Sequence, residues 1–133
     1  MERLILDTSA LVSLERGRVE PTHVLPDDDA DVAICAVTAA ELLVGVELAD
    51  DRYRERRSEL VEGAIERVEI IPFDLEIARH HASLLAHTRR AGRPRGAHDL
   101  QIAATAMATG RTIITGDATA FDGLPGVTHR LLS

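Results

Sequence analysis

The chain has 133 residues, 45% of them hydrophobic, and its 22 acidic residues outnumber its 15 basic ones, giving a formal net charge of −7. This composition predicts one globular domain over residues 1–133, and it excludes a disordered chain and nucleic-acid binding through the overall field. No window approaches the roughly 20 apolar residues of a membrane-spanning helix and no signal peptide is evident, so we expect no membrane partner and a cytoplasmic location.

Apolar runs rich in branched residues alternate with helical patterns along the chain. The runs predict strands at residues 4–6, 32–35, 68–71 and 112–114, with a last edge strand at 128–131. Helices are predicted at residues 8–15, 38–66, 74–91 and 99–109, and loops at 17–30 and 92–96. The charged segment after residue 50 is a candidate for a separate helix. This alternation predicts an α/β fold, a short and mostly parallel sheet flanked by helices on both faces.

Acidic side chains follow four of the predicted strands or open the helices after them. They are Asp7, Glu41, Asp99 and Asp117. Each has a structural interpretation: Asp7 and Asp117 suit turns, Glu41 completes a capping box with Thr38, and Asp99 suits the N-cap of its helix.

The four acids together favour a different interpretation. Because the carboxyl ends of parallel strands meet at one rim, the carboxylates should converge there, and such a cluster needs a neutralising cation. Oxygen ligands without clustered histidine or cysteine select Mg²⁺ or Mn²⁺. Ions of this kind assist phosphodiester hydrolysis, so the pattern predicts a metal-dependent nuclease.

Four segments of the sequence resemble the PIN-domain ribonucleases, most closely the VapC toxins of toxin-antitoxin pairs. Residues 4–11 read Leu-Ile-Leu-Asp-Thr-Ser-Ala-Leu, and residues 98–106 read His-Asp-Leu-Gln-Ile-Ala-Ala-Thr-Ala. Residues 36–46 contain Thr-Ala-Ala-Glu, and residues 113–127 contain Ile-Ile-Thr-Gly-Asp. The resemblance covers nearly the full chain. It implies a PIN-like fold, divalent-metal-dependent cleavage of RNA with 5′-phosphate and 3′-hydroxyl ends, a homodimer, and a cognate VapB-type antitoxin.

The resemblance also implies roles for individual residues. The catalytic and metal-binding acids would be Asp7, Glu41, Asp99 and Asp117, with supporting hydroxyls from Thr8 and Thr115. The sequence departs from the family pattern at the fourth acid, where family members often carry asparagine followed three residues later by aspartate. Here Asp117 replaces the asparagine and Ala120 the aspartate, so Asp122 is a second candidate for the fourth acid.

A cluster of arginines precedes Asp99: Arg89, Arg90, Arg93 and Arg95. We hypothesise that Arg93 and Arg95 bind substrate phosphates, because guanidinium groups match phosphate geometry and would supply a local positive surface that the net charge of −7 does not provide. The alternative is a solvated helix end, where cations are favoured.

Two further alternatives stay open. The fold could serve as a catalytically silent protein-binding module. The helix after residue 38 is apolar nearly all round, and its excess apolar surface could be covered by residues 51–70, by a second protomer, or by an antitoxin helix.

Overall fold

The computed structural model describes residues 1–17 and 30–132, so most of the predicted loop 17–30 lies outside the described residues. In the described part of the chain, five strands form one sheet in the order β3-β2-β1-β4-β5, and every neighbouring pair is parallel. The strands are β1 (Arg3–Leu6), β2 (Asp31–Cys35), β3 (Glu69–Ile71), β4 (Thr112–Thr115) and β5 (His129–Leu131). The predicted parallel sheet is confirmed, including its last edge strand.

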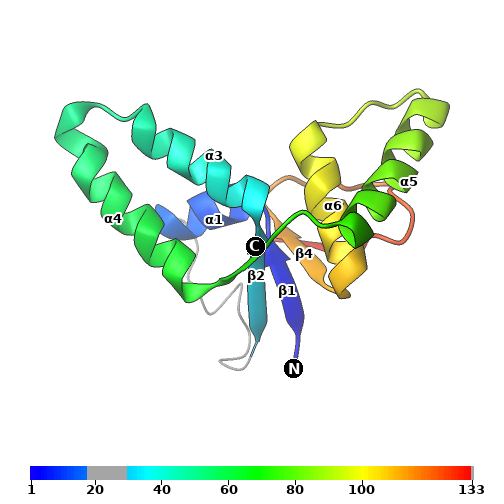
Figure 1. The fold of residues 1–133 in the computed structure, drawn as a ribbon, viewed down its shortest axis with the longest axis horizontal. Helices are drawn as coiled ribbons and strands as arrows, with labels where there is room; N and C mark the ends of the chain where they lie inside the picture. The colour runs from blue at the N-terminus through cyan, green and yellow to red at the C-terminus, as the bar shows by residue number, and fades with distance from the viewer. Residues whose placement is uncertain (18–29, 133) are drawn as a thin grey trace.

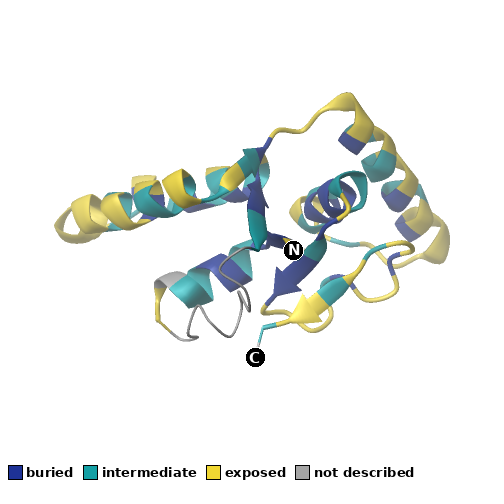
Figure 2. Ribbon diagram, turned by 90° about the horizontal axis from the view of Figure 1, so that it is seen from below, coloured by how far each residue is buried: buried dark blue, intermediate teal, exposed yellow. Residues whose placement is uncertain are grey.

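Helices cover both faces of this sheet, as predicted (Figure 1). They are α1 (Thr8–Glu15), α3 (Ala36–Glu47), α4 (Asp51–Arg67), α5 (Leu75–Ala91) and α6 (Ala97–Thr109). Alternate residues of each strand face opposite layers. Ile5 of β1 packs in a core with α5 and α6, whereas Leu4 and Leu6 pack in a second core with α1, α3 and α4. Figure 2 shows the inner strands largely buried, and the edge strand β5 and the outer sides of α4 and α5 exposed.

The predicted helix 38–66 is in fact two helices. The chain leaves α3 after Glu47, and Asp50 begins α4 as its N-cap by accepting a hydrogen bond from the Arg52 N–H at 3.2 Å. Within this pair Leu42, Val46 and Val61 are buried in one core, so α4 covers part of the apolar surface of α3. Other large apolar residues of this region stay exposed: Leu43, Val44 and Leu48 at α3 and its C-terminal end, and Tyr53 and Leu60 on α4.

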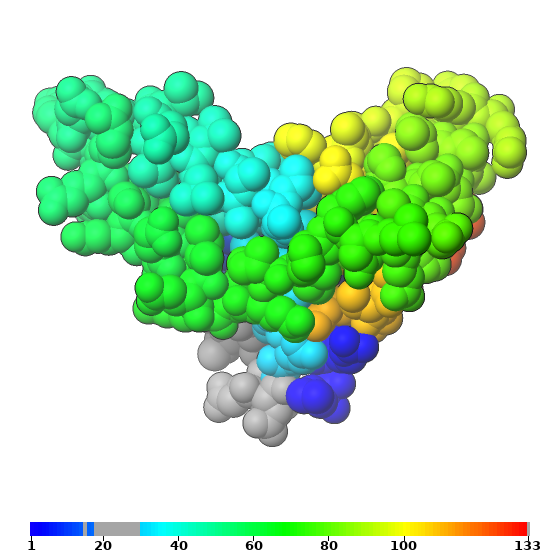
Figure 3. All heavy atoms as spheres, in the orientation of Figure 1, coloured from blue at the N-terminus to red at the C-terminus, as the bar shows by residue number. Residues whose placement is uncertain are grey.

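The two helix pairs lean away from each other. Figures 1 and 3 show α3 and α4 on one side and α5 and α6 on the other, with a notch between them at the carboxyl ends of the strands. The notch lies at the rim where the four acids are predicted to converge. Within residues 1–17 and 30–132, no helix has the length and apolarity needed to cross a membrane.

The opposite rim is held by Arg111, whose side chain is 2% exposed. One Nη atom donates to the carbonyls of Leu4 at 3.1 Å and Asp31 at 2.9 Å, and to the Asp31 carboxylate at 3.0 Å. The other Nη donates to the carboxylates of Asp31 at 3.2 Å and Glu69 at 3.1 Å. These contacts join β4 to β1, β2 and β3 at their amino ends.

Replacing Arg111 by methionine should lower the free energy of unfolding by about 2–3 kcal/mol, because several hydrogen bonds to a buried charge are lost. The Arg111 guanidinium lowers the pKa of Asp31, so this stabilisation exists at neutral pH and is lost as the pH falls through the folded-state pKa. Urea unfolding at several pH values measures both effects. Arg130→Met is the matched control, because Arg130 pairs with Glu2 at the exposed surface and should cost at most about 1 kcal/mol. An equal loss in both variants would contradict this account.

Candidate active site

Asp7 directly follows β1 and is the N-cap of α1. Its Oδ1 accepts hydrogen bonds from the Ala10 N–H at 2.8 Å and from the Ser9 hydroxyl at 2.7 Å. Its Oδ2 accepts a hydrogen bond from the Thr115 hydroxyl at 2.5 Å. The residue is 4% exposed, so both carboxylate oxygens are fixed in a buried position. The predicted supporting hydroxyl Thr115 therefore lies beneath the rim and orients Asp7.

Ser9 also connects α1 with the end of β4. Its oxygen accepts a hydrogen bond from the Gly116 N–H at 2.8 Å while its hydroxyl donates to Asp7. A Cβ at Gly116 would lie 3.2 Å from the Ser9 oxygen, so glycine permits this close approach. Sequence analysis missed Ser9. A hydroxyl two residues after a strand-end aspartate is a local signal for such a contact, but the Gly116 contact joins residues 107 positions apart.

Glu41 lies in the second turn of α3 and points to other elements. Its Oε1 accepts a hydrogen bond from the Thr8 hydroxyl at 3.0 Å and lies 3.1 Å from Nδ1 of His98. The capping-box interpretation of Glu41 is wrong, because α3 begins at Ala36 and its cap makes no side-chain hydrogen bond. Thr8, the other predicted hydroxyl, therefore orients Glu41, and His98 is a neighbour that the sequence analysis missed.

Asp99 is the third residue of α6. The interpretation of Asp99 as the N-cap is wrong, because Gly96 occupies that position. Burial raises the pKa of Asp99, and the charges of Asp7, Asp117 and Glu41 raise it further, while His98 opposes them. The four predicted acids thus lie close enough for their charges to interact.

Asp117 lies in the turn after β4 and is exposed. Its Oδ1 accepts hydrogen bonds from the Thr119 N–H at 2.9 Å and the Thr119 hydroxyl at 3.0 Å, and these bonds lower the pKa of Asp117. Asp122, the second candidate for the fourth acid, instead lies 3.4 Å from Nε2 of His129. Asp117 and Ala120 both line the cleft of the acids, whereas Asp122 does not.

These side chains line one cleft of about 190 Å³ at the rim of the sheet. Its lining residues are Asp7, Thr8, Ser9, Glu41, His98, Asp99, Asp117 and Ala120. They come from four separate stretches of the chain, at the starts of α1, α3 and α6 and in the turn after β4. Across the described residues, no group of three or more histidine, cysteine, aspartate or glutamate side chains is arranged so that it could hold a metal ion. The carboxylates of Asp7, Glu41 and Asp117 are instead held by hydroxyl, N–H and histidine partners.

The two arginines predicted to bind substrate do not line this cleft. Arg95 donates to main-chain carbonyls of the loop after β4. Arg93 is exposed; its N–H donates to the Thr88 carbonyl at 3.1 Å, but its side chain makes no hydrogen bond or ion pair with the residues that the structure describes. The structure therefore separates two residues that the sequence analysis treated alike.

The sequence model of the PIN domain family matches residues 4–125 of the chain. The chain is 36% identical over 126 residues to "Ribonuclease VapC5" of Mycobacterium tuberculosis, covering 92% of this chain and 90% of that protein. It is 28% identical over 130 residues to the "tRNA(fMet)-specific endonuclease VapC" of Salmonella typhimurium, covering 96% of each. Among solved structures, DNA-bound VapBC from Salmonella typhimurium matches with a TM-score of 0.88 and 27% identity, over 100% of both chains.

The matches span almost the whole of each relative, so the similarity extends to the full set of elements around the cleft. VapC nucleases of the PIN type generally depend on a divalent metal. The chain therefore belongs to the PIN-domain family, as a VapC-type ribonuclease.

Proposed function

We propose that this chain is a toxic endoribonuclease that hydrolyses RNA phosphodiester bonds with Mg²⁺ or Mn²⁺, and that residues 1–133 act as one PIN domain. The metal-binding and catalytic acids in this proposal are Asp7, Glu41, Asp99 and Asp117. One observation carries it: four carboxylates from distant parts of the chain line a single cleft. Burial raises the pKa of Asp99, repulsion from the other three carboxylates raises it further, and a cation in the cleft would relieve that repulsion.

The donors in the cleft suit a hard divalent ion. They are oxygen atoms apart from the ring nitrogens of one histidine, His98, and the described residues bring no cysteine to the cleft, so the set favours Mg²⁺ or Mn²⁺ over zinc. Mg²⁺ usually keeps several waters and takes only one or two carboxylates from the protein, so a complete cage of side chains is not required. When bound, such an ion neutralises charge on the phosphate and makes water a better nucleophile.

The neighbouring polar groups keep the carboxylates in place before RNA arrives. Thr115 and Ser9 hold the two oxygens of Asp7, and Thr8 holds Glu41. Partners of this kind fix the orientation of metal-binding carboxylates. Because these bonds already exist in the metal-free chain, little reorganisation is needed on binding.

RNA must be attracted locally, because the net charge of −7 repels it. Arg93 is the better candidate of the two arginines predicted to bind substrate, since its guanidinium has no protein partner among the described residues. It lies in the connection between α5 and α6, on the side of the notch opposite α3.

We further infer a cytoplasmic toxin that forms a homodimer and is neutralised by a VapB-type antitoxin. The solved relatives include VapBC toxin-antitoxin complexes. The exposed apolar residues of α3 and α4 offer a surface for a protein partner: Leu43, Val44, Leu48, Tyr53 and Leu60.

The test maps the ends of cellular RNA after controlled expression of the chain, beside an Asp7→Asn control. We expect new 5′-phosphate and 3′-hydroxyl ends with the wild type only. Purified protein should cut the same sites with Mn²⁺ or Mg²⁺ and lose the activity in chelator. The catalytically silent binding module predicts identical RNA ends for wild type and control, and that result would refute the nuclease.

A further inference from the structure

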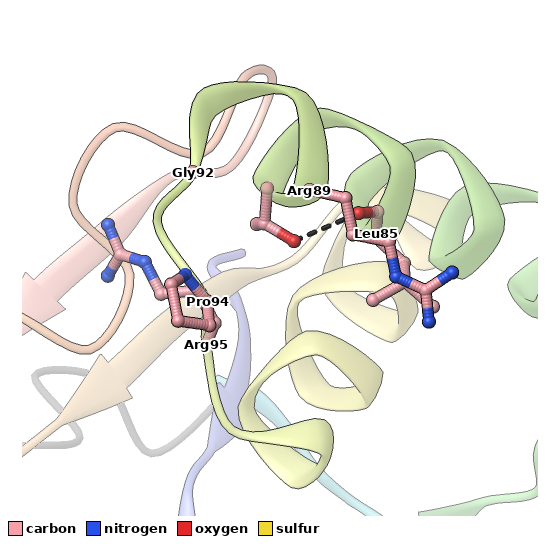
Figure 4. A pocket seen from close by; sticks show the side chains of 6 residues that line it. Leu85, Arg89, Gly92, Pro94 and Arg95 are labelled. Atoms are coloured by element: carbon pink, nitrogen blue, oxygen red, sulfur yellow. Dashed lines mark hydrogen bonds between the residues drawn. The ribbon is translucent and has the colours of Figure 1, made fainter.

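Arg95 makes three hydrogen bonds to main-chain carbonyls far away in the sequence. One Nη donates to the carbonyl of Thr119 at 2.6 Å and to that of Ala120 at 3.0 Å, and the other donates to the carbonyl of Asp122. Figure 4 shows the Arg95 side chain pointing away from α5, toward the loop that follows β4. A guanidinium with two nitrogens engaged by carbonyls is poorly placed to bind a phosphate as well.

The carbonyls that Arg95 holds belong to the turn that carries Asp117. The N–H and hydroxyl of Thr119 donate to the Asp117 carboxylate, and the Ala120 N–H also lowers its pKa. The Thr119 carbonyl and the Ala120 N–H are the two ends of one peptide group. Arg95 therefore donates to the carbonyl end of this peptide group, while the Asp117 carboxylate accepts from its N–H end. Hydrogen bonds linked through one peptide group in this way polarise and strengthen each other.

Arg95 is also tied to the segment that carries Asp99. It directly precedes Gly96, the N-cap of α6, and the Gly96 carbonyl accepts the first helical hydrogen bond from the Leu100 N–H at 3.1 Å. Asp99 lies in the same first turn. One side chain thus connects the two segments that bring Asp99 and Asp117 to the cleft.

We propose that Arg95 is a positioning residue that fixes the 117–122 turn against the start of α6, so that Asp99 and Asp117 face one metal-binding cleft. This inference rests on the proposed function for the role of the two acids. It replaces the predicted phosphate contact of Arg95, and of the two arginines predicted to bind substrate it leaves Arg93 available to RNA.

The first measurement is hydrogen exchange of the metal-free full chain, comparing Arg95→Met with Arg93→Met. Loss of hydrogen bonds to a charged group should speed exchange in the 117–122 turn by roughly tenfold or more, while the sheet stays protected. Arg93→Met should match wild type. Equal exchange of the turn in Arg95→Met and wild type would overturn the proposal, and so would equal acceleration in both variants.

The second measurement is Mn²⁺ binding without RNA, followed by the paramagnetic signal of the free ion. Partners that orient metal ligands typically contribute about 10- to 100-fold in metal affinity, so Arg95→Met should weaken binding by about tenfold or more. Unchanged Mn²⁺ affinity would overturn the proposal. Arg95→Lys keeps the charge but not the paired nitrogens, so it should fall between wild type and Arg95→Met, and it serves where Arg95→Met does not fold.

The third measurement separates the positioning role from a phosphate contact. A single-stranded oligoribonucleotide is titrated in chelator at several salt concentrations. A lost phosphate contact lowers the slope of log affinity against log salt by about 0.7, whereas a positioning role leaves the slope unchanged. A lower slope for Arg95→Met with an unaltered turn would overturn the proposal. Absence of RNA cleavage by the wild type would refute the proposed function instead, because exchange and Mn²⁺ binding are measured without cleavage.

Discussion

Asp99→Asn should abolish RNA cleavage and leave the metal-free protein at least as stable as the wild type. Metal assistance contributes several kcal/mol to the transition state, which corresponds to a loss on the order of 10³-fold when a ligand is removed. The substitution should not lower the stability of the metal-free protein, although it abolishes cleavage. Burial first, and then the charges of Asp7, Asp117 and Glu41, raise the pKa of Asp99. The ionised form is therefore costly in the folded protein.

The pH dependence follows from this direction. A carboxyl whose folded-state pKa exceeds its unfolded value binds its proton more tightly in the native state, so it destabilises the fold as the pH rises through the folded-state pKa. The neutral asparagine removes this cost. The difference in melting temperature between Asp99→Asn and wild type should be small in acid, grow toward neutral pH in chelator, and reverse when Mn²⁺ stabilises only the wild type.

Glu76→Gln is the matched control for Asp99→Asn. Glu76 is an exposed acid in the first turn of α5, just as Asp99 is in the first turn of α6. An acid at this position stabilises a helix through its dipole, so Glu76→Gln should lower the melting temperature slightly and keep cleavage intact. If Asp99→Asn in chelator also lowered the melting temperature, the helix-dipole role would explain Asp99 and the carboxylate cluster would not.

The sequence predicted the sheet well because its signal is local. Short runs of branched apolar residues, each followed by a helical pattern, have few alternatives to a parallel sheet covered on both faces. The rule that ligands lie at the carboxyl ends of such strands then placed the four acids on one rim. The starts of α3 and α6 were predicted too late, because Cys35 and Gly96 cap these helices without a side-chain hydrogen bond and so leave no cap signal.

The contacts that the sequence did not predict are long-range. Ser9 and His98 reach Gly116 and Glu41 across separate elements, and no spacing rule connects such pairs. The arginines show the same limit. Arg93 and Arg95 are equivalent in a cationic cluster, and only the carbonyls of a turn 24 to 27 residues later distinguish them.

Two substitutions of Asp7 should separate the two roles of its side chain, as a metal ligand and as the N-cap of α1. In Asp7→Asn the amide oxygen still accepts the Ala10 N–H and the Ser9 hydroxyl, and the Thr115 hydroxyl turns to accept from the amide nitrogen. Asp7→Ala leaves these donors without an acceptor. Both variants should lose cleavage by on the order of 10³-fold. Asp7→Ala should be less stable than Asp7→Asn by about 1–2 kcal/mol in urea unfolding.

Asp74 gives the control for the capping role of Asp7. It caps α5 by accepting the Ile77 N–H at 2.9 Å, in the same geometry but outside the cleft. Asp74→Ala should therefore lose stability relative to Asp74→Asn by about 1 kcal/mol, and both should cut RNA as the wild type does. Cleavage by Asp7→Asn would rule out Asp7 as a required metal ligand. Equal stability of Asp7→Asn and Asp7→Ala would show that the hydrogen bonds around this carboxylate serve the metal site without stabilising the fold.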